Sequence, residues 1–182
     1  MRRAAFLLLA TALAAPATVF YTKAAGRLMP GTPPPMAAPE DLADRLLVEK
    51  SERRLSLYRE GRLLARYRVA LGGDPGGGPK RQDGDERTPE GLYRIDWRND
   101  RSIAHLSLHI SYPEAGDLAQ AAAAGVSPGG NIMIHGLPNG WGFLGGLHRA
   151  FDWTDGCIAV TNAEMRDIWA RVPTGTEIEI RP

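Results

Sequence analysis

Short segments in which apolar and polar residues alternate recur along the chain, and they restrict the fold more than any other feature. Alternation over four to eight residues is typical of β-strands that are covered on one face. Turn-forming residues separate these segments, and Arg59-Glu60-Gly61-Arg62 indicates a hairpin turn between two of them. The segments are residues 45–50, 54–58, 63–71, 92–97, 105–112, 131–135 and 176–180.

Two further segments have the composition of short helices. Residues 117–124 are mostly alanine and are followed by Gly125, a common helix end. Thr161 and Glu164 have the spacing of a capping box, which predicts a helix from there to about Val172. We count seven or eight strands and two short helices without a regular βαβ repeat, so the sequence predicts a mostly-β domain in which sheet packs on sheet.

The charge of the chain gives no reason to expect a nucleic-acid partner. The formal net charge is +1 over 182 residues, and the charged residues are scattered. Residues 72–91 form a long loop rich in glycine, proline and charge, which resembles a phosphate-binding loop only superficially. It has no Gly-Lys-Ser/Thr sequence and no helix pattern follows it, so we do not interpret it as a nucleotide site.

The N-terminus has the layout of an export signal. Met1-Arg2-Arg3 precedes an apolar run over residues 4–20, which predicts either a cleaved signal peptide or an uncleaved membrane anchor within residues 1–25. The proline-rich residues 26–41 are typical of a linker. We therefore expect a single folded domain over residues 42–182, exported to the periplasm or cell envelope, with an anchor in the inner membrane as the alternative to cleavage.

Cys157 is the only cysteine of the chain, and it follows the turn-forming residues Thr154-Asp155-Gly156. A single cysteine cannot form an intramolecular disulfide, and a structural zinc site would need more soft ligands. Two interpretations of Cys157 remain. It is either an inert, buried apolar residue or a reactive thiolate presented by a tight turn.

His135 is the first candidate for a base that activates such a thiol. It ends an apolar strand segment and is followed by Gly136 and a glycine-rich loop, a common position for a functional residue. His148 is the rival candidate. His105 and His109 are about 13 Å apart if both lie on one strand, too far to share a metal ion, so we predict no metal site.

Three motifs in order resemble the L,D-transpeptidase (YkuD-type) catalytic domain. They are Ile134-His135-Gly136, Thr154-Asp155-Gly156-Cys157-Ile158 and the C-terminal VPTGTEIEI, and Arg87–Ile95 (RTPEGLYRI) is similar to a further segment of that family. The resemblance extends from about Leu46 to Ile180.

This resemblance implies a β-sandwich-like fold of mixed sheets and acyl transfer on peptidoglycan stem peptides without a cofactor. Cys157 would be the nucleophile, His135 the proton acceptor and donor, and the backbone N–H groups of Gly156 and Cys157 the oxyanion donors. A thioester formed with loss of D-Ala would pass to an amine, giving a 3→3 cross-link. A hydrolase that uses water, or a non-catalytic wall-binding module, are the alternatives.

The chain departs from the family pattern around this centre. Asp155 replaces the usual histidine, and Ala159 replaces an arginine that commonly follows, so we expect Arg149 to supply a carboxylate anchor. Trp141, in an insertion between His135 and Cys157, is a candidate substrate lid. His109 and Tyr112 are candidates to line the donor groove, and Asp155 is either a turn residue or a polarising group. The sequence leaves the oligomeric state open.

Overall fold

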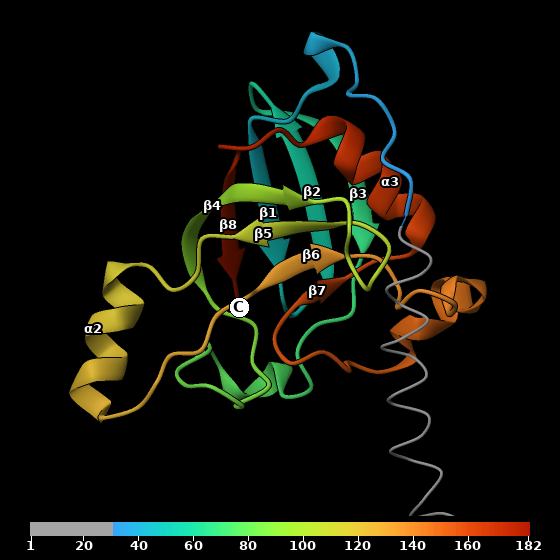
Figure 1. The fold of residues 1–182 in the computed structure, drawn as a ribbon. Helices are drawn as coiled ribbons and strands as arrows, with labels where there is room; N and C mark the ends of the chain where they lie inside the picture. Colours follow the sequence, from blue (N-terminus) through green and yellow to red (C-terminus); the bar gives the residue numbers. More distant parts are fainter. Residues whose placement is uncertain (1–30) are drawn as a thin grey trace, which may run out of the picture.

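The computed structural model describes residues 31–182, so the predicted signal or anchor over residues 1–25 lies outside the described residues. The described chain forms one eight-stranded mixed sheet in the order β3-β2-β1-β8-β4-β5-β6-β7 (Figure 1). Two pairs, β1 with β8 and β6 with β7, are parallel, and the others are antiparallel. The strands are β1 (Arg45–Glu49), β2 (Arg54–Arg59), β3 (Arg62–Arg68), β4 (Gly91–Asn99), β5 (Ser107–Ile110), β6 (Met133–His135), β7 (Ile158–Ala159) and β8 (Glu177–Arg181).

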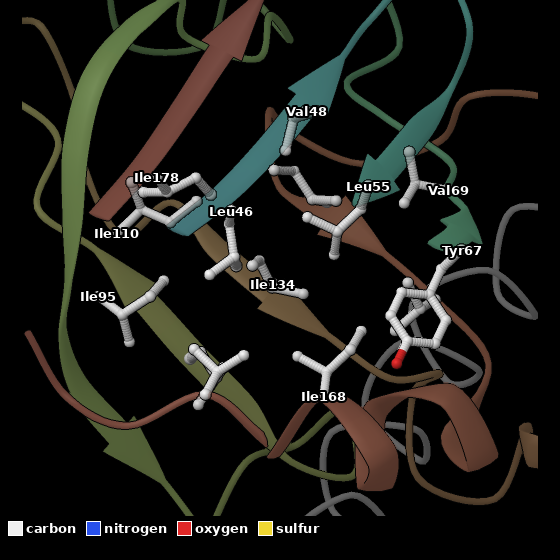
Figure 2. Close-up of a cluster of buried hydrophobic side chains, with 14 of the residues drawn as sticks. Leu46, Val48, Leu55, Tyr67, Val69, Ile95, Ile110, Ile134, Ile168 and Ile178 are labelled. Carbon is white, nitrogen blue, oxygen red and sulfur yellow. The ribbon is translucent and has the colours of Figure 1, made fainter. Parts of the chain in front are cut away.

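The sheet curls because β4 belongs to both of its halves. Residues 91–94 of β4 pair with β8, whereas residues 95–99 pair with β5. As a result β5 and β6 cross in front of β1 and β2, and the apolar faces of the two halves enclose the core (Figure 1). Figure 2 shows Leu46 and Leu55 of one half near Ile134 of the other, all fully buried.

Helix α3 (Asn162–Arg171) closes one open side of this core with Met165, Ile168 and Trp169. The predicted capping box is present, since Thr161 Oγ1 accepts the Glu164 N–H and the Glu164 carboxylate accepts the Thr161 N–H. Helix α2 (Ala115–Ala124) lies at the periphery and buries only one of its residues (Figure 1). Three 3₁₀ segments complete the described chain: η1 (Pro39–Asp41), η2 (Pro75–Gly77) and η3 (Gly142–Ala150).

The predicted fold class, mostly β with mixed sheets and two short helices, is confirmed. Two local predictions differ from the structure. His105 is not on a strand, because β5 begins at Ser107 and His105 has a positive φ of 66°. The glycine-rich insertion, expected to be a loop, contains the 3₁₀ segment η3, interrupted at Gly145 where φ is 48°.

The proline-rich residues 31–41 lie along the domain. The Gly31 N–H donates to the carbonyl of His105 at 2.9 Å, and the Ala37 N–H donates to the carbonyl of Ala170 at 2.8 Å. The second of these bonds holds the segment beside α3. Among the described residues, no helix combines the length and the apolar character that crossing a bilayer requires.

The Thr161 cap offers a test of how α3 is held. Replacing Thr161 by alanine removes the hydroxyl that satisfies the Glu164 N–H, so we expect the free energy of unfolding to fall by about 1 kcal/mol. Thr161→Ser keeps the hydroxyl, so it should lower the free energy of unfolding clearly less than Thr161→Ala does. Urea unfolding followed by circular dichroism measures both, and equal losses in the two variants would contradict a role for the cap.

Candidate active site

Cys157 and His135 lie at the ends of two adjacent parallel strands. Ile134 of β6 pairs with Ile158 of β7, and His135 pairs with Ala159, so Cys157 lies opposite Met133 by continuation of the register. Alternate residues of a strand share a face, and therefore His135 and Cys157 lie on the same outer face of the sheet. The side chains of Ile134 and Ile158 point the other way, into the core.

One pocket of about 370 Å³ collects these side chains. Its walls are Ser102, Ile103, Ala104, Met133, His135, Pro138, Trp153 and Cys157. The structure thus brings the predicted thiol and imidazole to one cavity, and most of the other lining atoms are apolar. An apolar pocket with few polar groups is the usual form of a small-ligand or active site.

The turn before Cys157 is fixed by Thr154 and Gly156. The Thr154 hydroxyl donates to the Cys157 carbonyl at 2.7 Å and accepts the Gly156 N–H at 3.3 Å. Gly156 has a φ of 116°, and a Cβ there would lie 2.5 Å from the carbonyl oxygen of Arg87. Only glycine meets both requirements, because an L side chain is strained at this φ and would collide with the backbone.

This hydrogen bond corrects the prediction that Gly156 supplies an oxyanion donor. The Gly156 N–H is buried and directed to Thr154 Oγ1, so it is not presented to the pocket. The Cys157 N–H, in contrast, donates to no other atom of residues 31–182. Of the two predicted backbone donors, only the one at Cys157 is available.

The His135 ring is oriented by its own neighbour in the chain. Nδ1 lies 2.6 Å from the Gly136 carbonyl oxygen, and since a carbonyl only accepts, Nδ1 carries the proton and Nε2 the lone pair. The ring also packs edge-on against Trp153, with centroids 5.8 Å apart. Burial lowers the pKa of His135, although the bond to Gly136 acts in the opposite direction, so the ring is neutral at pH 7.

The thiol of Cys157 is also neutral in this structure. Burial raises its pKa above the ordinary value, and the carboxylate of Asp155 raises it further, whereas the backbone of Met133 and the ammonium of Lys80 lower it. Sγ donates to the Asn131 carbonyl at 3.6 Å and makes no hydrogen bond with His135. The pair is therefore a neutral thiol and a neutral imidazole in one pocket, and the S–H hydrogen bond to Asn131 must break before the thiol proton can pass to Nε2.

His148, the rival base, lies behind Trp153. It is buried, its Nδ1 accepts the indole N–H of Trp153 at 3.4 Å, and its Nε2 has no partner among the described residues. It lines a second pocket of about 210 Å³, with Leu137, Pro138, Trp141, Leu144, Phe151 and Trp153, and not the pocket of Cys157. Burial and the guanidinium of Arg149 lower its pKa to about 4.

Three of the five predicted substrate residues lie on the side of the sheet that carries the pockets, and the other two do not. Asp155 is exposed next to the thiol, and its charge acts on Cys157. Trp141 stacks on Phe143 and forms a wall of the second pocket, which shares Pro138 and Trp153 with the first. His109 pairs with Met133 in the β5–β6 register and so faces the same side as the first pocket.

Tyr112 and Arg149 do not lie where we expected. Tyr112 is 2% exposed, and its hydroxyl donates to the Pro128 carbonyl at 3.0 Å, so it packs in the core. Arg149 forms an ion pair with Glu164 of α3 and lines neither pocket. The expected carboxylate anchor at Arg149 is therefore wrong, because its charge is already neutralised by a partner that the sequence did not reveal.

Sequence reasoning missed the buried ion pair that organises the loop over residues 72–91. Lys80 Nζ lies 2.8 Å from Asp85 Oδ1, and both side chains are buried. Burial raises the pKa of Asp85, but bonds from the Arg81 N–H, Lys80 and two further backbone N–H groups lower it to about 2. In the sequence, Lys80 and Asp85 looked like ordinary loop charges.

Comparison with known proteins agrees with this geometry. The model of the L,D-transpeptidase catalytic domain, YkuD, matches residues 43–180, and the chain belongs to this family. No curated protein sequence matches the chain.

Among solved structures, the fold is similar to Pgp2, a helical cell shape determining protein from Campylobacter jejuni. The TM-score is 0.60 and the identity 21%, over 89% of this chain and 54% of that one. It is also similar to Bd1075 from Bdellovibrio bacteriovorus, with a TM-score of 0.52 and an identity of 22%, over 84% of this chain and 53% of the other. This chain thus spans about half the length of these two proteins.

Gly156 can be tested against a matched glycine. We expect Gly156→Ala to lower the free energy of unfolding by about 3 kcal/mol, since it combines an unfavourable φ with a backbone collision. Gly140 also has a positive φ, 89°, but has open space around it, so Gly140→Ala should cost only about 1 kcal/mol. Calorimetric or urea unfolding compares them, and equal losses would mean that the contact with Arg87 is not restrictive.

The neutral state of the thiol predicts its pH dependence. Because the pKa of Cys157 is raised, the thiolate fraction should still increase above pH 9, and alkylation by iodoacetamide should accelerate there. Asp155→Asn removes a negative charge that opposes the thiolate, so labelling at pH 7.5 should become severalfold faster. Intact-mass kinetics measure both. A rate that levels off below pH 7 would show a stable thiolate–imidazolium pair instead.

Proposed function

We propose that this protein is a cysteine-dependent L,D-transpeptidase that acts on the stem tetrapeptides of peptidoglycan. The observation that carries the proposal is the placement of Cys157 and His135 on one face of the β6–β7 pair, in one open pocket. Membership of the L,D-transpeptidase catalytic domain family supports the same reaction class.

In the first half-reaction, Sγ of Cys157 attacks the carbonyl carbon of the third stem residue while Nε2 of His135 takes the thiol proton. The bond from Nδ1 to the Gly136 carbonyl keeps Nε2 unprotonated before the attack. The Cys157 N–H, which has no other acceptor among the described residues, would donate to the negative charge that develops on the carbonyl oxygen. When the tetrahedral intermediate collapses, the imidazolium returns its proton to the departing amine of D-Ala, and a thioester remains.

In the second half-reaction an amine of another stem attacks the thioester and His135 takes its proton. The thiol leaves as the amide forms, which gives a 3→3 cross-link. Water in place of the amine would make the same centre an L,D-carboxypeptidase.

The proposed setting is the cell envelope. The signal-like N-terminus would deliver the catalytic domain to the periplasm, either released or held by an inner-membrane anchor. Pgp2, with which the chain shares its fold, is described as a helical cell shape determining protein. We extend the proposal to a role in setting cell-wall architecture.

The reaction is tested with the purified full chain and disaccharide tetrapeptides. We expect release of D-Ala and a thioester adduct on Cys157 in the intact mass. Cys157→Ser should abolish both, and His135→Ala should slow D-Ala release by at least 100-fold, the usual contribution of a general base. His148→Ala is the matched control and should change the rate by less than about tenfold. Undiminished activity of Cys157→Ser would refute the mechanism.

A second measurement identifies the acceptor. With an amine-bearing acceptor peptide present, the expected product is a cross-linked dimer, and without it the thioester should persist or hydrolyse slowly. Tripeptide as the sole product under both conditions would identify a carboxypeptidase.

A further inference from the structure

A row of side chains crosses the outer face of the sheet from Cys157 to β4. Cys157 lies opposite Met133 of β6, Met133 pairs with His109 of β5, and His109 pairs with Trp97 of β4. Residues paired directly across strands point to the same face. The indole ring of Trp97 therefore lies on the same side of the sheet as the Cys157 thiol, three strands away. This ring takes no part in the proposed chemistry.

A β-bulge shapes the far end of this row. Ile95 pairs with Ile110 and Trp97 with His109, so Asp96 is an extra residue and both Asp96 and Trp97 face His109. Such a bulge redirects side chains, and bulges are frequent beside active sites. Here it lets the Asp96 carboxylate reach His109 Nδ1 at 2.6 Å while Trp97 stacks on the His109 ring, with centroids 5.0 Å apart and planes 20° apart.

The resulting platform is ordered but open. Trp97 is 40% exposed, and the side chain of Asp96 is 41% exposed, whereas that of His109 is only 13% exposed. Asp96 accepts the Nδ1 proton, and Nε2 of His109 has no partner in residues 31–182. A stacked aromatic pair beside fixed polar atoms offers both an apolar face and directed hydrogen bonds.

We propose that Trp97, His109 and Asp96 bind a pyranose ring of the glycan strand that carries the donor stem peptide. The apolar C–H face of an amino sugar would pack on the indole, and its hydroxyl or amide N–H groups would donate to Asp96 and to Nε2 of His109. This inference rests on the proposed function, since it assigns the sugar part of the same substrate.

The spacing along the row fits such a substrate. Three strand spacings separate Trp97 from Cys157, which is about 14 Å. The carbonyl attacked at the third stem residue is about 10 Å from the start of an extended peptide of three residues, and the group that joins the peptide to the sugar adds the remainder. A stem that crosses the strands along this row would place its sugar at Trp97 when its third carbonyl reaches the thiol.

Binding is tested first, without catalysis, in the full-length Cys157→Ala protein. We expect the peptide-free disaccharide of the glycan strand to shift the indole N–H signal of Trp97 saturably in NMR spectra, with that signal assigned from Trp97→Phe. Trp97→Leu should abolish the binding. Leu92→Ala, an exposed apolar residue of the same strand in the part paired with β8, should preserve it. Perturbation of other indole signals only, or of none, would overturn the proposal.

Kinetics supply the second test. Trp97→Leu should raise the KM for the disaccharide tetrapeptide about tenfold while kcat and the KM for the free tetrapeptide stay unchanged, and Trp97→Phe should recover part of the loss. Equal effects on both substrates would show a structural role and refute the subsite. Disaccharide binding at Trp97 by a wild-type protein that releases no D-Ala would refute the proposed reaction but not the subsite.

Discussion

The parallel pairing of β6 with β7 is the constraint on which the site depends. Ile134 and Ile158 are paired and fully buried, and together they fix which residues of the two strands face outward. A shift of one residue in this register would turn the thiol or the imidazole into the core. The burial of Ile134 and Ile158 in the core therefore keeps the side chains of Cys157 and His135 on one face of the sheet, although neither of these two side chains is part of the core.

The second support of the site comes from a part of the chain far away in sequence. The turn at Gly156 packs on the loop over residues 72–91, where the carbonyl of Arg87 occupies the space that a side chain would need. The Gly73 N–H donates to the Thr154 carbonyl at 3.0 Å, and the Gly72 N–H donates to Thr88 Oγ1 at 3.1 Å. The buried Lys80–Asp85 pair holds that loop in shape. The loop over residues 72–91 thus supports the turn that precedes Cys157, and we do not interpret it as a ligand-binding loop.

Much of this architecture could be predicted from local patterns. Alternation located every strand except β7, and the Thr161–Glu164 spacing located α3. The end of a strand segment located His135, and the turn-forming residues before it located Cys157. Each of these signals reports the environment of a residue along its own element. The predictions that failed are those that depend on which residue a side chain contacts in the folded chain. Nothing near Arg149 in the sequence indicated Glu164, and nothing near Tyr112 indicated that its hydroxyl would meet the Pro128 carbonyl.

For the same reason the role of the Gly156 N–H was predicted wrongly and the β4 bulge was not predicted. The bond from that N–H to Thr154 depends on the rotamer of the threonine, which a motif does not specify. The bulge at Asp96 appears in the sequence as an uninterrupted alternation, and only the pairing with β5 shows that one residue is extra. Local patterns specify elements, whereas the chemistry of a site depends on contacts between elements.

The protonation state of the centre connects its geometry with its environment. Burial raises the pKa of Cys157 and lowers that of His135, so both groups are uncharged before substrate binds. Oxidation of cysteine proceeds through the thiolate, and a neutral thiol is the more resistant form. In the oxidising envelope that we propose for this protein, a lone cysteine kept neutral at rest would survive, and the proton would leave only when a bound carbonyl is ready to accept the sulfur. The arrangement that makes the resting thiol a weak nucleophile would therefore also keep it intact.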